Sequence, residues 1–277
     1  MLCPHPVKGQ FIYKGMFQIY PGEYLGDGPY CRDYPITIEI CTEVTEPYFR
    51  FSTHPHKLPI GQKIIELQHL LSVFSQFYFS NGTISETSLN EFSKIDFENI
   101  PLNCISYYQN GLLYSMDVKQ VCFPPDLELY FDKYFSIDNK KIKLAFRKAA
   151  YLFYLGVEME SQYRSHSFAS FVSAIETLVK ATYHKSKMCT NPECGQPIYS
   201  ATRKYCDFIR EYTGITNEAY IKKLYNARSK FLHEGLILFS ETPWEDERNI
   251  CDDDDYWLRK NIIGITRASI INWLLRQ

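Results

Sequence analysis

The pattern of this sequence changes once, after Pro124-Pro125, and the helical periodicity that follows restricts the fold more than any other feature. From there to the C-terminus, apolar residues recur at the three- and four-residue spacing of helices. The expected helices lie at about 139–162, 166–184, 199–213, 217–234 and 258–276. Five helices in about 140 residues predict a helical bundle. The 166–184 helix places five apolar residues on one stripe: Phe168, Phe171, Val172, Ile175 and Val179.

The first half has a different pattern, which predicts a mixed domain of strands and one helix. Segments 10–20, 35–42 and 47–52 are rich in Ile, Tyr, Phe and Thr and are separated by turn residues, as strands are. Asn110-Gly111 between two such runs predicts a hairpin. A helix is expected at about 61–78, apolar almost all round and therefore buried. The fold class is thus α+β, with a domain of residues 1–135 and a bundle of residues 136–277.

Composition and apolar run length exclude several classes of protein. Hydrophobic residues make up 45% of the 277, too many for a disordered chain or a fibrous repeat. No stretch reaches the ~18 apolar residues of a membrane span. The first residues contain no apolar core of a signal peptide. We expect a cytoplasmic protein without membrane contact, whose nine cysteines are mostly reduced.

The net charge of -2 conceals an uneven distribution along the chain. Residues 1–138 carry 9 Lys and Arg against 16 Asp and Glu, a net of -7. Residues 139–240 carry 16 basic against 8 acidic side chains, a net of +8. A basic helical segment is typical of a domain that binds a polyanion, although solvated helices also carry excess lysine.

Arg228 does not fit the apolar pattern of its helix. Ile221, Leu224, Tyr225 and Leu232 form the apolar stripe of the 217–234 helix, and Arg228 falls inside that stripe. An arginine there is costly unless it pairs with a carboxylate, extends to the edge or lines a cleft. Glu176, at the rim of the neighbouring helix's stripe, is the candidate carboxylate.

His233 follows Arg228 by five residues and lies near the end of the same expected helix. We expect that helix to have its N-cap at Thr216 and to end at Gly235. This Arg-x4-His spacing, in the string Tyr225-Asn-Ala-Arg-Ser-Lys-Phe-Leu-His-Glu-Gly, resembles the end of a late helix in the HEPN family. A match to this spacing alone is expected by chance in a chain of this length and composition, so the surrounding residues carry the resemblance. The family allows four to six residues between the arginine and the histidine, and Arg50 and His56 also match as Arg-x5-His, but prolines exclude a helix there.

Two further segments resemble the Apea-like HEPN subgroup. The Ser-Ala-Ile-Glu176 core of the 166–184 helix is similar to the preceding helix of that bundle, and the spacer from Cys189 to Cys194 is similar to its linker. The resemblance covers about residues 139–240 and extends at most to the C-terminus. It implies a HEPN-like helical bundle, while the N-terminal half resembles no family.

The resemblance implies a metal-independent endoribonuclease, of a kind found in prokaryotic defence and toxin-type systems. Arg228 and His233 would be catalytic, and no cofactor would be required. On one regular helix the two lie about 140° apart and do not point at the same atom. Members of the family resolve this by dimerising, so the resemblance implies a homodimer in which two motifs meet across the cleft. The supporting residues would be Glu176, Asn226, Ser229 and Lys230. The products would be a 2′,3′-cyclic phosphate and a 5′-hydroxyl.

Other interpretations of the same residues stay open. His233 can be a helix C-terminal histidine favoured by the helix dipole. The bundle can be a non-catalytic module that binds RNA, a nucleotide or a protein partner. The acidic N-terminal domain can receive a regulatory partner, although its His54 and His56 form no recognisable site.

A cysteine pair and an aspartate run are possible metal ligands. Cys189 and Cys194 can supply half of a structural zinc site, with His184 and Cys206 as the nearest further candidates, or remain free thiols. The run Asp252 to Asp255 is more typical of a solvated charged loop than of a two-metal centre, because consecutive carboxylates cannot all face one pair of ions.

Overall fold

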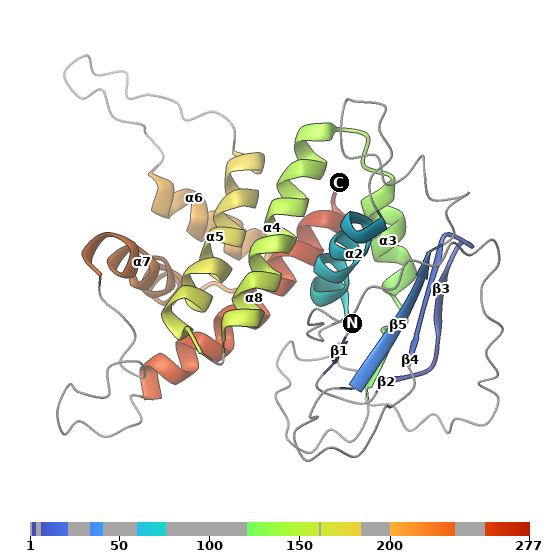
Figure 1. Ribbon diagram of the computed structural model, residues 1–277. Coiled ribbons are helices and arrows are strands. Elements are labelled where there is room, and N and C mark those ends of the chain that lie inside the picture. The colour runs from blue at the N-terminus through green and yellow to red at the C-terminus, as the bar shows by residue number, and fades with distance from the viewer. Residues whose placement is uncertain are drawn as a thin grey trace. The chain divides into compact units, whose positions relative to one another are not determined.

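The computed structural model describes eight stretches of the chain (Figure 1). They are residues 2–3, 7–21, 34–40, 60–75, 121–160, 162–183, 200–235 and 253–277. The chain divides into two compact units, Met1–Ser136 and Ile137–Gln277, next to the residue at which the sequence pattern predicts a boundary. The described strands all lie in the first unit, whereas helices occur in both, so the chain is α+β.

The first unit contains a small antiparallel sheet with the strand order β1-β5-β4-β3. A second pair, β2 with β6, is parallel. The strands are β1 (Leu2–Cys3), β2 (Val7–Lys8), β3 (Phe11–Tyr13), β4 (Phe17–Pro21), β5 (Tyr34–Ile40) and β6 (Val121–Cys122). In the central pair, Phe17 lies opposite Ile40 and Ile19 lies opposite Ile38.

Segment 10–20, expected as a strand, folds as a hairpin instead. Tyr13 pairs with Phe17, and the chain reverses between them. Lys14 and Gly15 have positive φ angles of 43° and 68°, which a tight reversal requires and which glycine adopts without a Cβ clash. The expected strand at 47–52 and the hairpin at Asn110-Gly111 lie outside the described residues.

Helices α2 (Ile60–Phe74) and α3 (Leu127–Phe135) belong to the same unit. The sequence interpretation missed α3 and extended α2 to 78. The sequence pattern predicted that α2 is buried on almost all sides. This prediction was wrong for one side of the helix, because Ile65 is 44% exposed. Phe131 of α3 is fully buried, with its ring centroid 5.1 Å from Phe17 and 5.2 Å from Phe74. Aromatic packing therefore joins α3 to both the sheet and α2.

His69 of α2 makes the stability of this unit depend on pH. Burial lowers its pKa from 6.5 to about 4. The unfolded chain then binds more protons than the folded one between pH 6.5 and about 4, so stability falls as the pH is lowered through this window, by up to about 3 kcal/mol. Urea unfolding at pH 7 and pH 4.5 should show this loss, and His69→Gln should reduce it. An equal loss in both proteins would contradict it.

The second unit contains the five expected helices, with ends shifted by a few residues (Figure 1). They are α4 (Lys140–Met159), α5 (Arg164–Thr182), α6 (Ala201–Thr213), α7 (Glu218–Glu234) and α8 (Asp253–Leu275). The predicted N-cap of α7 at Thr216 was wrong, because the Asn217 side chain accepts the hydrogen bond from the Tyr220 N–H. The predicted helix end is confirmed, since Gly235 caps α7 with a φ of 68°.

Helix α8 begins earlier than the sequence pattern indicated. Asp253, Asp254 and Asp255 form its first turn, so the interpretation of these residues as a loop was wrong. Acidic residues are favourable at this end of a helix because of the helix dipole. Among the described residues, no helix is long and apolar enough to cross a membrane.

The core of the second unit forms where α5 packs against α4 and α8. All five apolar residues predicted for the α5 stripe are buried. Phe153 of α4 lies 5.3 Å from Phe171 of α5, centroid to centroid. On α8, Trp273 stacks with Phe146 and donates its Nε1–H to Thr182 Oγ1 at 2.8 Å. The indole is thus both packed and hydrogen bonded.

The close approach of α4 and α5 depends on Gly156. A Cβ at this position would lie 2.8 Å from the Phe171 ring, which is itself buried. The carbonyl of Gly156 also accepts a hydrogen bond from Ser167 Oγ at 2.6 Å. Glycine therefore allows both the ring contact and the helix-to-helix hydrogen bond.

Gly156→Ala is expected to destabilise the bundle by about 1–3 kcal/mol, because overpacking a filled core outweighs the better helix propensity of alanine. Urea unfolding measures this change. The matched control is Glu158→Ala, an exposed position on the same helix, which should change stability by less than about 0.5 kcal/mol. A Gly156→Ala protein as stable as the wild type would contradict the crowding.

Candidate functional site

Arg228 of α7 forms an ion pair with Glu176 of α5. Arg228 Nη2 lies 2.7 Å from Glu176 Oε2, and the two side chains are only 18% and 15% exposed. The sequence predicted this carboxylate as one possible partner, and that prediction is confirmed. Within the described part of the chain, Arg228 Nε is buried without a hydrogen-bond acceptor. The guanidinium is thus bound to Glu176 through Nη2, while its Nε–H has no acceptor among the described residues.

Two tyrosines complete the polar cluster around this ion pair. Burial raises the pKa of Tyr225, and Glu176 raises it further by its charge and by accepting the phenol's hydrogen bond. Tyr205 of α6 is fully buried, with its ring centroid 5.1 Å from that of Tyr225. Burial raises the pKa of Tyr205 as well, and the Glu176 charge adds to this. Both phenols therefore stay protonated at neutral pH. Two side chains of α7, Arg228 and Tyr225, contact the Glu176 carboxylate.

The sequence interpretation had not assigned a polar role to Tyr225. We expect Tyr225→Phe to destabilise the fold by about 1 kcal/mol, because it removes a hydrogen bond to a charged, half-buried group. Urea unfolding tests this, and the loss should disappear in a Glu176→Leu background, in which the acceptor is gone. An equal loss in both backgrounds would show that the hydroxyl acts elsewhere.

The other predicted site residues of α7 lie toward solvent. His233, Asn226 and Lys230 are exposed, and Ser229 is partly exposed. Leu232 had been assigned to the buried stripe, which was wrong, because it is 48% exposed. Only Ile221 and Leu224 of α7 are buried, so the second half of the helix makes few core contacts. The structure brings Glu176 and Arg228 together but does not place His233 beside them.

A second histidine, His166, lies next to the second half of α7. It is exposed in the first turn of α5, and its ring centroid is 5.0 Å from that of Phe231, at an interplanar angle of 76°. Phe231 lies between Arg228 and His233 in the sequence. The sequence interpretation missed His166, because nothing in the pattern of α5 indicated which part of α7 would face its first turn.

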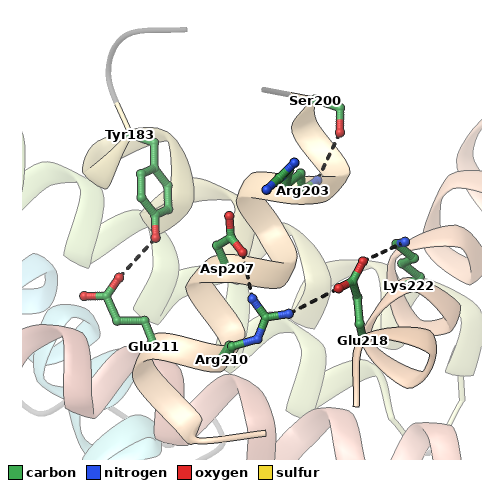
Figure 2. A network of polar contacts seen from close by, with 8 residues as sticks. All are labelled: Tyr183, Ser200, Arg203, Asp207, Arg210, Glu211, Glu218 and Lys222. Carbon is green, nitrogen blue, oxygen red and sulfur yellow. Dashed lines mark hydrogen bonds and ion pairs between the residues drawn. The ribbon is translucent and has the colours of Figure 1, made fainter. Parts of the chain in front are cut away.

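A surface network of charged residues joins α6 to the beginning of α7 (Figure 2). Arg210 bridges the two helices, with Nη1 2.9 Å from Asp207 and Nη2 3.3 Å from Glu218. Glu218 also pairs with Lys222 at 2.7 Å, and this contact lowers the pKa of Glu218. Exposed pairs contribute little stability. The network joins α6 to the first turns of α7, and it involves none of the residues of the Arg228 cluster.

The candidate zinc ligands are largely outside the described residues, namely Cys189, Cys194 and His184. The fourth, Cys206, is buried in α6, and burial raises the pKa of its thiol. Within the described stretches, no three His, Cys, Asp or Glu side chains are grouped as metal ligands. The zinc site stays a prediction.

Comparisons with protein-family models, with curated proteins and with solved structures found no match for this chain. The resemblance to the HEPN family therefore stays a prediction from the residues that carry it.

Proposed function

We propose that this protein is a metal-independent endoribonuclease of HEPN type, in which Arg228 and His233 act at a homodimer cleft. The observation that carries the proposal is the position of Arg228 and of an exposed His233 five residues apart on α7. The ion pair of Arg228 with Glu176 is the arrangement expected of a binding module, and it is also compatible with a catalytic arginine. It fixes the guanidinium on the helix that also presents an exposed histidine. RNA cleavage without a metal requires activation of the 2′-hydroxyl, stabilisation of the phosphorane charge and a proton for the 5′-oxygen. A guanidinium can provide the second function, and imidazoles can provide the first and the third.

The chemistry divides between the two side chains. His233 of one protomer would take the proton of the ribose 2′-hydroxyl, and the copy of His233 in the second protomer would give a proton to the leaving 5′-oxygen. Arg228 would stabilise the negative charge of the pentavalent phosphorane. Attack of the 2′-oxygen on phosphorus breaks the bond to the 5′-oxygen, which leaves a 2′,3′-cyclic phosphate and a 5′-hydroxyl.

A second copy of the chain would complete the site. Arg228 and His233 point about 140° apart on one helix, so one chain cannot aim both at one phosphate. The second half of α7 makes few core contacts and carries the exposed Leu232, as expected of a helix with a further partner. We propose a cytoplasmic homodimer, with the N-terminal unit receiving a regulatory partner.

The second candidate is a non-catalytic module that binds RNA, a nucleotide or a protein. The same ion pair favours it, because an arginine neutralised by a carboxylate also has a purely structural use. The two candidates differ in their dependence on His233, because only the enzyme requires its exposed imidazole.

The test is to incubate the purified full-length protein with RNA in excess EDTA, beside Arg228→Ala and His233→Ala. The matched control is Arg210→Ala, which also removes an arginine paired with carboxylates, but in the separate α6–α7 network. Cleavage by the wild type and by the control alone supports the enzyme. Cleavage that neither Arg228→Ala nor His233→Ala lowers would refute the assignment.

A further inference from the structure

Three aromatic rings form a continuous array beside the second half of α7. Tyr163 immediately precedes α5 and is 55% exposed. Its ring centroid lies 6.3 Å from that of His166, at an interplanar angle of 81°. His166 in turn lies 5.0 Å from Phe231 of α7. The array therefore runs from the start of α5 to the helix that carries Arg228 and His233.

The backbone of Tyr163 is held at both sides. Its N–H donates to the Met159 carbonyl at 2.8 Å, and its own carbonyl accepts from the Ser167 N–H at 2.8 Å. The exposed ring thus belongs to a residue whose backbone is hydrogen bonded on both sides, and His166 contacts the ring at its edge. A fixed ring loses little conformational freedom when a flat ligand covers it.

The chemistry of the surroundings favours a nucleic acid as that ligand. On α7, Arg228 lies one turn before Phe231 and on the same side of the helix, so the array lies beside a guanidinium that Glu176 holds in place. Unpaired nucleobases stack on aromatic side chains while nearby cations bind the phosphates of the same strand. Paired bases in a duplex do not offer a free face.

We propose that Tyr163 is a stacking subsite for an unpaired nucleobase of single-stranded RNA, with His166 and Phe231 supporting its ring. This inference rests on the proposed function, and it adds that the substrate is single-stranded near the scissile phosphate. The array contacts α7 at Phe231, and it would give the enzyme a contact that duplex RNA does not make.

The test measures the affinity of a fluorescent single-stranded RNA for the His233→Ala protein, which retains the subsite but does not turn over. Adding Tyr163→Ala should weaken binding about 5- to 150-fold, the equivalent of one stacked base. Tyr163→Phe and Tyr163→Trp should retain it. Tyr151→Ala, an exposed tyrosine of α4, is the matched control and should leave affinity within about twofold.

Three outcomes would overturn the subsite. They are an unchanged affinity in Tyr163→Ala, an equal loss for duplex RNA of the same sequence, and a change in oligomeric state that accounts for the loss. The third would place Tyr163 in contact with a second copy of the chain. If Tyr163→Ala weakens RNA binding but the wild type does not cleave RNA, the nuclease is refuted and the subsite is retained. If the wild type cleaves RNA and Tyr163→Ala changes neither binding nor cleavage, the subsite alone is refuted.

Discussion

Replacing His233 by alanine is expected to lower the rate of RNA cleavage by about 10²- to 10⁴-fold, the usual contribution of a general acid or base. Stability should change by less than about 1 kcal/mol, because the side chain is exposed in the last turn of α7 and makes at most a favourable contact with the helix dipole. Single-turnover cleavage and urea unfolding measure the two effects separately.

The neighbouring Glu234→Ala serves as the control for His233, because it alters an exposed residue of the same turn. It should cleave within about threefold of the wild type. The structural interpretation of His233 as a favourable C-terminal cation predicts the opposite pattern, namely a small loss of stability and unchanged cleavage. That result would contradict the catalytic role.

Variants of Arg228 and Glu176 separate the structural use of their ion pair from its chemical use. Arg228→Ala should lower stability by about 1–3 kcal/mol, because it leaves a mostly buried carboxylate without its cation. It should also lower cleavage by about 10²- to 10³-fold, as removal of a transition-state donor does. Glu176→Gln, which keeps the shape, should lower cleavage less.

The double variant Arg228→Leu with Glu176→Leu is the decisive comparison. Replacing a buried ion pair by apolar side chains often restores stability, so this protein should unfold near the wild-type urea concentration. Its cleavage should stay as low as that of Arg228→Ala. If cleavage returned together with stability, Arg228 would be a structural residue with no part in the chemistry, and the Arg228 and His233 site would be refuted.

Local sequence signals predicted the fold of the second unit well, because helix periodicity and caps depend on neighbouring residues. The α5 stripe and the Gly235 helix end are examples. Helix α3 was missed because its burial comes from tertiary contacts of Phe131 with Phe17 and Phe74, which no local pattern contains. Leu232 was placed in the core because periodicity does not say where a helix stops making contacts.

The candidate site was predictable to the extent that one residue conflicted with its own helix. Arg228 in an apolar stripe required a partner, and Glu176 was within reach on a neighbouring stripe. Tyr225 and His166 gave no such conflict, since an aromatic residue in a stripe and a histidine in a first turn are both ordinary. Their roles depend on the way in which α5, α6 and α7 meet.

The chemical identity of the RNA ends tests the proposed nuclease most directly. RNA incubated with the wild-type protein in EDTA should acquire 2′,3′-cyclic phosphate and 5′-hydroxyl ends, and the His233→Ala protein should produce about 100-fold fewer. RNA that stays intact with the wild type, or ends that form equally with His233→Ala, would contradict cleavage by Arg228 and His233.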